Sequence, residues 1–357
     1  MRTIVSTKTT NHRTLGPRDR EILRDVIHTY ITSGRPVSSR AVSKHVEPSL
    51  SAATIRNVMA DLEESGYLYQ PHTSAGRVPT QSAYRLYVES LMEQQQLPLH
   101  ERRYIEEHLR HVSDGDELID AASRLLSELS HKVGVALKPA VGDAVLKAMD
   151  FVPLAERRVL CVVVSTTGFI DNFVIEADDE LSRDELVRIS NYVNDNFAGL
   201  TLRDIRDRLI AMMAEERAQV DRHLSSVIDL ARRAIDRSQS APGVLVRGAN
   251  ALLDQPELAD VDRVRRMLDT FADKARLVSV LNKCLASGGV RVVIGEDSEL
   301  TSELDFSLVA TCYGIGSQPL GTLGILGPSR MEYARIVSLV HFLGQTLSSR
   351  LAASAID

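Results

Sequence analysis

Three helix-forming segments, separated by residues that end helices, occupy the first 66 positions of the chain. Pro17 is tolerated in a first helical turn, where a backbone N–H has no partner anyway, and Gly34 followed by Pro36 ends the first helix. Pro48 limits the second helix because it pushes the preceding residue out of the helical region, and Ser51 is a good N-cap for the third. A long helix, a short helix, a tight turn and a third helix are typical of a helix-turn-helix.

The third predicted helix has an apolar face from Ile55 to Leu62 and a polar face opposite, when side chains are placed at about 100° per residue. The polar face suits base edges: arginine donates two hydrogen bonds to guanine, asparagine pairs with adenine, and a small apolar group contacts the thymine methyl. For any one position a solvated polar residue explains the pattern equally well, but the set favours DNA recognition. The predicted contacts of the second and third helices are Ser38, Ser39, Arg40, Ser51, Ala53, Thr54, Arg56 and Asn57.

The pattern then changes from helical to extended. Residues 67–70 and 77–79 flank a turn of small residues at 71–76, which predicts a hairpin, the wing of a winged helix. Arg77 lies just beyond the turn, where a cation can follow the phosphates or enter a narrow minor groove. The wing therefore adds Arg77 to the predicted DNA contacts.

A fourth helix is predicted after the hairpin, capped by Thr80 and extending to about residue 96. Tyr84 and Arg85 near its start are expected to contact the DNA backbone. The polar segment before Pro17 is expected to be a disordered tail.

Charge is divided unevenly along the chain. The first 85 residues contain twelve Lys and Arg against seven Asp and Glu, a net charge of +5, whereas the whole chain carries −6, which leaves −11 for the remainder. A basic segment on an acidic body is typical of a DNA-binding module joined to a domain that does not bind DNA. Chance segregation of charge is the alternative.

Five separated motifs are similar, in order and spacing, to those of one family. They are Gly34–Ser39, Ser51–Asn57, Leu62–Tyr67, Ser74–Thr80 followed by Tyr84-Arg85, and Gly321–Pro328 followed by Met331–Tyr333. On these residues the chain resembles the HrcA family of heat-inducible transcription repressors over essentially its whole length. Ala75 stands where the family usually has serine in the wing, a change that leaves the role of the wing as it is.

The resemblance implies a function and a fold. Members of the family repress chaperone operons of the groESL and dnaK type by binding, as dimers, a palindromic element called CIRCE. They depend on the GroEL chaperonin to stay active, so heat, which occupies the chaperonin, leaves less active repressor. The family fold is a winged helix followed by a GAF-like domain with an inserted dimerisation region. It carries no enzymatic activity and no cofactor.

The rest of the chain alternates between helical and extended patterns. Residues 100–138 have helical spacing, extended stretches follow at 148–154, 159–165 and 169–176, and residues 182–238 are helical again with charged flanks. A narrow apolar stripe on a long inserted helix suits packing against a partner helix, and a palindrome requires two subunits. Packing on the helix's own domain is the alternative. The residues predicted for dimerisation are Leu202, Ile205, Leu209, Met212, Val220 and Leu224.

The length of 357 residues predicts two or three domains. Strand patterns return between 244 and 326, and a helix at 331–351 closes the chain. The fold class is α+β multidomain, with a winged helix-turn-helix, a GAF-like domain and an inserted, mainly helical dimerisation region. The predicted domains are 1–98, 99–177 with 242–357, and 178–241; the pattern leaves open to which unit strands 148–176 belong.

Other classes of protein fit the sequence less well than a DNA-binding repressor does. No segment has the roughly 20 apolar residues of a membrane span, and the polar N-terminus does not resemble a signal peptide, so a cytoplasmic protein is expected. The three cysteines and ten histidines show no disulfide or metal-ligand spacing. The glycines at 314–324 lack the Lys-Ser/Thr and the helix of a phosphate loop. Two alternatives stay open: a ligand-sensing regulator, and a hydrolase or signalling enzyme, although no nucleophile with a base is found.

Overall fold

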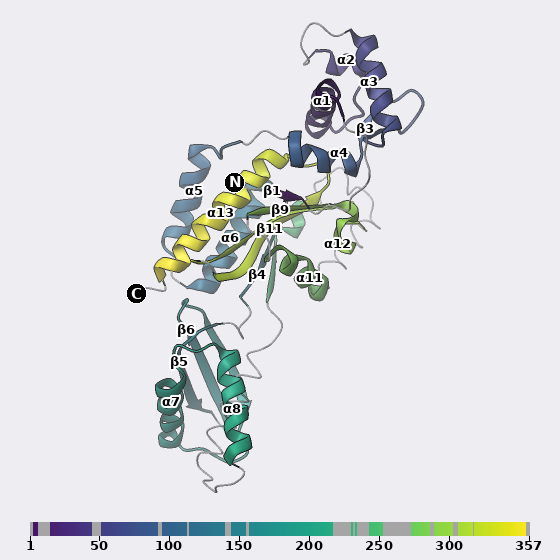
Figure 1. Cartoon of the computed structure of the whole chain (residues 1–357). Coiled ribbons are helices and arrows are strands. Elements are labelled where there is room, and N and C mark those ends of the chain that lie inside the picture. The colour runs from purple at the N-terminus through teal and green to yellow at the C-terminus, as the bar shows by residue number, and fades with distance from the viewer. Residues whose placement is uncertain are drawn as a thin grey trace.

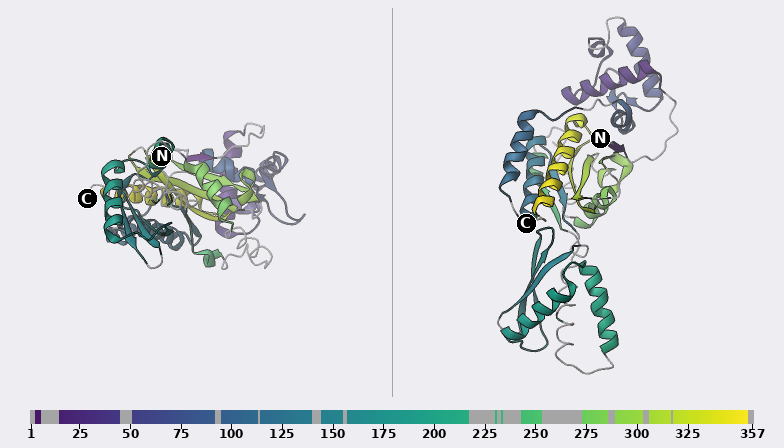
Figure 2. Two further views of the ribbon diagram at one scale, coloured as in Figure 1. Left: turned by 90° about the horizontal axis from the view of Figure 1, so that it is seen from below. Right: turned by 60° about the vertical axis from the view of Figure 1, so that its left-hand side comes forward.

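The computed structural model describes residues 3–5, 15–44, 51–91, 95–112, 114–139, 144–154, 157–216, 230, 233, 243–252, 273–285, 289–302, 306–316 and 318–354. These residues form three bodies arranged along one long axis (Figures 1 and 2). We call them the N-terminal module (residues 17–91), the sheet domain (the described residues among 3–5, 95–139 and 243–354), and the inserted lobe (the described residues among 146–216, with Leu230 and Arg233). No helix within the described ranges is long and apolar enough to cross a membrane.

The N-terminal module consists of short helices followed by a small hairpin. Its first helix ends at Gly34, whose φ of 66° lies in the left-handed region that glycine adopts without strain. Ser38 and Ser51 cap the next two helices by accepting hydrogen bonds from Ala41 N and Thr54 N. The elements are α1 (Pro17–Ser33), α2 (Ser39–Val42), α3 (Ala52–Glu64), β2 (Leu68–Tyr69), β3 (Val78–Pro79), α4 (Gln81–Leu86) and a π-helical turn, η1 (Tyr87–Leu91).

The sheet domain contains a six-stranded sheet in the order β1-β9-β10-β11-β4-β8. All its pairs are antiparallel except β1 with β9. Helices α13 and α6 pack on one face and α11 on the other, so alternate residues of one strand enter two cores: Val292 lies in one and Val293 in the other. The strands are β1 (Thr3–Val5), β4 (Val133–Leu137), β8 (Val244–Arg247), β9 (Val290–Ile294), β10 (Phe306–Ile315) and β11 (Gln318–Pro328).

The helices of the sheet domain correct one prediction. Residues 100–138 do not form a single helix, because Asp114 caps a new helix and the buried run at 133–137 forms the strand β4. The helices are α5 (Leu99–Arg110), α6 (Gly115–Ser130), η3 (Ala249–Leu252), α11 (Lys274–Leu285), η5 (Gly295–Asp297), α12 (Glu299–Ser302) and α13 (Tyr333–Ser354).

The inserted lobe has its own sheet and its own core. Strands β5 (Leu146–Pro153), β6 (Arg158–Ser165) and β7 (Ile170–Glu176) pair antiparallel, apart from the six-stranded sheet. Helices α7 (Arg183–Phe197) and α8 (Leu202–Glu216) bury a separate apolar cluster with one face of these strands. The predicted boundary at 177 is therefore wrong: it falls inside the lobe, which begins before β5.

The lobe leaves and re-enters the sheet domain through neighbouring strands. Leu137 at the end of β4 is paired with Val244 at the start of β8, so the lobe is an insertion at the tip of a β-hairpin. The N-terminus brings a second correction. Thr3–Val5 pair in parallel with Val290–Val292, so these three residues form a strand at the edge of the sheet rather than part of a disordered tail.

Candidate nucleic-acid interface

Helix α3 presents the predicted polar face to solvent. Its buried residues are Ile55, Val58, Met59 and Leu62, the apolar face expected from the spacing. Ala53, Arg56 and Asn57 are exposed and Thr54 is half-buried. Because the rotation about the helix axis is fixed by the buried face, Arg56 and Asn57 are held outward on a rigid element.

Hydroxyl groups at the start of α3 and α2 stabilise the helix ends. Ser51 Oγ lies 3.1 Å from Thr54 N and 2.9 Å from Thr54 Oγ1, so the two hydroxyls are joined to each other. Ser38 Oγ accepts from Ala41 N at 3.2 Å. Ser38 and Arg40 are exposed and Ser39 is half-buried. Ser38 and Ser51 therefore act as helix caps, and both residues remain exposed at the surface that the helix ends form.

The hairpin is attached to the turn between α1 and α2. Val37 and Arg77 exchange two backbone hydrogen bonds, each 2.8 Å long. This approach requires glycine at position 76, because a Cβ there would lie 2.4 Å from the carbonyl oxygen of Val37. The side chain of Gln70 holds the loop between the strands by donating to the carbonyls of Thr73 and Ala75. The hairpin is thus fixed relative to the helices.

The hairpin, α2 and α3 enclose a shallow hollow of about 420 Å³. Four of the predicted DNA contacts line it, from three different elements: Ser38, Ser39, Arg56 and Arg77. The hollow also includes Gln70 and residues 73–76 of the hairpin loop. The structure therefore brings together residues separated by almost 40 positions in the sequence.

Arg77 has a partner that the sequence did not indicate. Its guanidinium Nη2 lies 2.8 Å from Glu63 Oε2 on α3, and the two side chains are 20% and 34% exposed. Arg77 therefore joins the hairpin to α3, besides facing the hollow. Glu63 lies within the Leu62–Tyr67 motif, but no role was predicted for it there. Only its place on the side of α3 toward the hairpin, known once the fold is known, identifies it as the partner of Arg77.

Tyr84 and Arg85 do not belong to this surface. Tyr84 is 3% exposed and its ring centroid lies 5.8 Å from that of Tyr333 in the sheet domain. Arg85 forms an ion pair with Asp297, also in the sheet domain. The prediction that these two residues contact the DNA backbone is wrong, because both side chains are used where α4 packs on the sheet domain.

The residues predicted for dimerisation are largely used inside the inserted lobe. Leu202, Ile205 and Leu209 are fully buried in the cluster that α8 shares with β5–β7 and α7. Met212 is half-buried against the same cluster, and Val220 and Leu224 lie outside the described residues. For the three buried leucine and isoleucine side chains the prediction is wrong, and the alternative, packing on the helix's own domain, applies.

The described part of the chain shows neither an activated cysteine thiol nor a cluster of metal-ligating side chains. Burial raises the pKa of the Cys284 thiol to about 11 and raises that of Cys161 further, so both thiols stay protonated near neutral pH. Among the residues that can be placed, no three His, Cys, Asp or Glu side chains gather as metal ligands would. The surface that stands out chemically is the polar one built by α2, α3 and the hairpin.

Comparison with known proteins identifies the family. Residues 116–337 match the family described as HrcA protein C terminal domain. A heat-inducible transcription repressor HrcA of Geobacter sulfurreducens is 38% identical over 338 residues, covering 94% of this chain and 98% of the relative. The repressor of the same name from Syntrophobacter fumaroxidans is 37% identical over 339 residues, covering 94% and 97%. The protein is thus a transcription repressor, of a class that is not enzymatic. It belongs to the HrcA family of heat-inducible transcription repressors.

One solved structure has a related fold. It is described as a hypothetical protein at 2.2 Å resolution, is 22% identical in sequence, and superimposes with a TM-score of 0.62 over 96% of this chain and 100% of its own. The likeness supports the mixed architecture of helices and antiparallel sheets, which the α+β prediction anticipated.

Proposed function

We propose that the chain represses chaperone operons by binding an inverted repeat of the CIRCE type as a homodimer in the cytoplasm, with its activity maintained by the GroEL chaperonin. The N-terminal module is then a winged helix-turn-helix, with α3 as the recognition helix and the β2–β3 hairpin as the wing. The sheet domain corresponds to the GAF-like domain. The inserted lobe corresponds to the dimerisation region, starting at about residue 145.

The observation that carries the proposal is the polar surface around α3. Arg56 and Asn57 project from a helix whose other face is buried, and Ser38, Ser39 and Arg77 line the same hollow or its rim. The N-terminal part of such a helix enters the major groove, where arginine and asparagine can read guanine and adenine. The net charge of +5 on the first 85 residues supplies the attraction to phosphate.

Dimerisation is assigned to the outer face of the β5–β7 sheet rather than to α8. Val152, Leu160 and Val174 lie side by side across the three strands, and Val164 is paired with Ile170 on the same face. Val152, Ile170 and Val174 are 45%, 50% and 42% exposed. Exposed, aligned β-branched residues of this kind mark an interaction surface.

The edge of β5 is a weaker candidate for the contact between subunits. Side chains of α7 already pair with its backbone: Met149 N donates to Asn194 Oδ1 and Asn194 Nδ2 donates to Met149 O. Phe151 N donates in the same way to Ser190 Oγ. An edge whose backbone groups are already paired offers little to a second strand. The outer face of the sheet is therefore the surface that we assign to the second subunit.

Loss of repression on heating would follow from unfolding of the sheet domain and the inserted lobe, the part of the chain that follows the N-terminal module. One apolar cluster runs from α1 and α3 of the N-terminal module through α4 to α13 and β9–β11 of the sheet domain. Because the two bodies share this core, loosening the sheet domain also disorganises the DNA-binding surface. The hypothesis is contradicted if the isolated dimer stays folded and DNA-bound well above the growth temperature.

The test is a gel-shift titration on a CIRCE-type inverted repeat, beside the same DNA with one half-site scrambled, each with and without GroEL. Tight binding that requires both half-sites and improves with the chaperonin is expected. Equal, weak and salt-sensitive binding to both DNAs would leave only a generic DNA-binding module and would overturn the proposal.

A further inference from the structure

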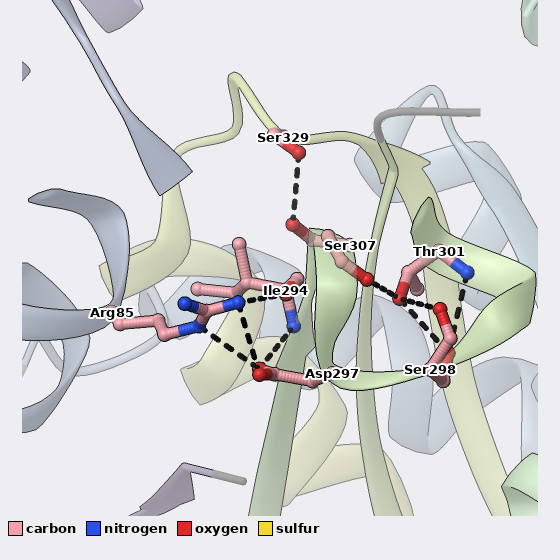
Figure 3. A network of polar contacts seen from close by, with 8 residues as sticks. Arg85, Ile294, Asp297, Ser298, Thr301, Ser307 and Ser329 are labelled. Atoms are coloured by element: carbon pink, nitrogen blue, oxygen red, sulfur yellow. Dashed lines mark hydrogen bonds and ion pairs between the residues drawn. The ribbon is translucent and has the colours of Figure 1, made fainter. Parts of the chain in front are cut away.

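The N-terminal module is joined to the sheet domain by a nearly dry ion pair. Arg85 on α4 reaches Asp297 at the end of η5: its Nη2 lies 3.0 Å from Oδ1 and its Nε 3.3 Å from Oδ2 (Figure 3). The same Nη2 also donates to the carbonyl of Ile294 at 3.1 Å. The side chains are 14% and 1% exposed, so little solvent screens the interaction.

The acceptor is held in place by its own loop. Asp297 Oδ2 accepts a hydrogen bond from the backbone N of Ile294 at 3.1 Å, which closes the η5 turn around the carboxylate. Thr301 donates from its hydroxyl to the carbonyl of Gly295, and Ser298 Oγ accepts from Thr301 N at 3.2 Å (Figure 3). The carboxylate therefore presents both oxygens to α4 in a fixed direction.

A second polar contact joins the two bodies at another helix. Arg330, just after β11, donates from Nη1 to the carbonyl of Ile31 in the last turn of α1, at 2.9 Å. A cation at a helix C-terminus is favourable because the unpaired carbonyls there carry partial negative charge. The guanidinium also covers Gly34, where an added Cβ would lie 3.1 Å from Nη1. Arg330 therefore fixes the far end of α1.

Between these two contacts the bodies share apolar packing. Tyr84 of α4 packs against Tyr333 at the start of α13, whose hydroxyl is in turn 2.8 Å from Ser307 Oγ on β10. Two polar contacts on different helices, with a common core between them, prevent rotation of the module about a single attachment point. The orientation of α3 relative to the sheet domain is thus set by specific side chains rather than by a linker.

We propose that Arg85, Asp297 and Arg330 are positioning residues that set the spacing between half-sites. This inference rests on the proposed function, since it requires a dimer bound to an inverted repeat. In such a dimer the distance and rotation between the two recognition helices determine which spacer brings both half-sites into register, about 10 base pairs per helical turn. Removing the contacts frees each module to turn, so that the dimer accepts spacers that the rigid form rejects.

The experiment measures binding of the full-length protein to inverted repeats whose spacer is changed in single base-pair steps and by about five base pairs, half a helical turn. Arg85→Ala, Arg330→Ala and the double variant are compared with the wild type. Arg124→Ala is the matched control, because Arg124 is 64% exposed and pairs with Asp120 within α6 rather than with the N-terminal module. Affinity for DNA with a single half-site and thermal unfolding are measured for every variant.

The wild type and Arg124→Ala should bind one spacer best and fall about 100-fold, to the affinity of a single half-site, when half a turn is added. The double variant should bind DNA with a single half-site within about twofold of the wild-type affinity. When half a helical turn is added to the spacer, its affinity should fall by less than about fivefold. Arg85→Lys, which keeps the charge but not the forked hydrogen bonds, should fall between them.

Two results would overturn the inference. One is an unchanged spacer optimum in a folded double variant; the other is an equal loss of affinity for every DNA, which would make Arg85 or Arg330 a DNA contact. Arg330→Ala supplies an independent test where Arg85→Ala unfolds, because the two arginines bind different elements. A wild type that binds one half-site as well as two contradicts the dimer proposal instead.

Discussion

Helix α3 of the N-terminal module and helix α8 of the inserted lobe have the same kind of sequence, an apolar stripe flanked by charges. In α3 the stripe is buried against α1 and the opposite polar face is exposed, and the polar face is the one of functional interest. In α8 the stripe was assigned to a partner subunit, but Leu202, Ile205 and Leu209 are buried within their own lobe. Helical spacing thus identifies which face of a helix is buried, but not whether that face packs on the same chain or on a second subunit.

The largest effect is expected in the core of the lobe. Leu209→Ala should lower the free energy of unfolding by about 2–5 kcal/mol, because it leaves a cavity in a fully buried cluster. Chemical unfolding, followed at several protein concentrations, measures it. Since the side chain packs within one chain, the loss should be the same at every concentration.

Val174→Ala is the matched control for that variant, because Val174 lies on the outer face of the same sheet and is 42% exposed. It should change the free energy of unfolding of the separated subunit by no more than about 0.5 kcal/mol and weaken association instead. If Leu209→Ala were the variant whose effect depended on concentration, α8 rather than the sheet would form the contact between subunits.

The second effect concerns the exposed face of α3. Arg56→Ala should cost about 1–3 kcal/mol of binding free energy and relax the preference at one base pair in each half-site, because a lost bidentate contact to guanine removes discrimination there. Titration against operators substituted at each position measures both. An equal loss on cognate and scrambled DNA would instead assign Arg56 to phosphate.

A smaller effect is expected where the hairpin meets α3. The pair of Arg77 with Glu63 is partly exposed, so a double-mutant cycle with Arg77→Ala and Glu63→Gln should give a coupling of about 0.2–1 kcal/mol in unfolding. Arg77→Ala should also weaken binding to all sequences alike if its other role is to contact phosphate. Glu63→Gln should weaken binding less than Arg77→Ala does. Loss of preference at a single base pair in Arg77→Ala would instead indicate that Arg77 contacts a base.

The smallest effect depends on pH and tests how the lobe meets the sheet domain. Burial raises the pKa of Asp171 on β7, Asp116 of α6 raises it further, and the backbone hydrogen bond of Asn172 and the charge of Lys138 lower it. The folded state therefore favours the protonated form. That stability is fully present below the ordinary pKa of about 4 and is lost as the pH rises through the raised value.

Asp171→Asn removes this titration. The variant should be more stable than the wild type at neutral pH, and the difference between the two melting temperatures should shrink as the pH is lowered toward 4. A difference that stays constant with pH would mean that Asp171 does not titrate differently in the folded protein.

The parts predicted correctly from the sequence depend on neighbours close in the chain. The ends of α1 and α3 were set by Gly34 and Ser51, whose capping partners lie within four residues. Tyr84 and Arg85 were assigned wrongly because their partners are distant: Asp297 lies 212 residues after Arg85. An exposed polar pattern on a short helix does not distinguish DNA from another domain of the same chain.

The same limit explains the other errors. The boundary at 177 was placed where strands gave way to helices, but β5–β7 are joined to α7 and α8 by packing rather than by strand pairing with the larger sheet. Residues 3–5, Thr-Ile-Val, lie in a polar segment and are too few to show the period of a strand. Only their pairing with β9 identifies them as a strand. Pairing between segments almost 300 residues apart leaves no local trace in the sequence.

The insertion at the tip of the β4–β8 hairpin has a consequence for how the chain folds. Leu137 is synthesised long before Val244, its partner in the sheet, and the whole lobe lies between them. Closing a loop of roughly 100 flexible residues is entropically costly, but a lobe that has already collapsed holds the two ends near each other and reduces that cost. The edge of β4 therefore stays unpaired on the nascent chain until the lobe is complete. During this interval a growing polypeptide exposes a strand edge flanked by apolar side chains, the kind of surface to which chaperones bind.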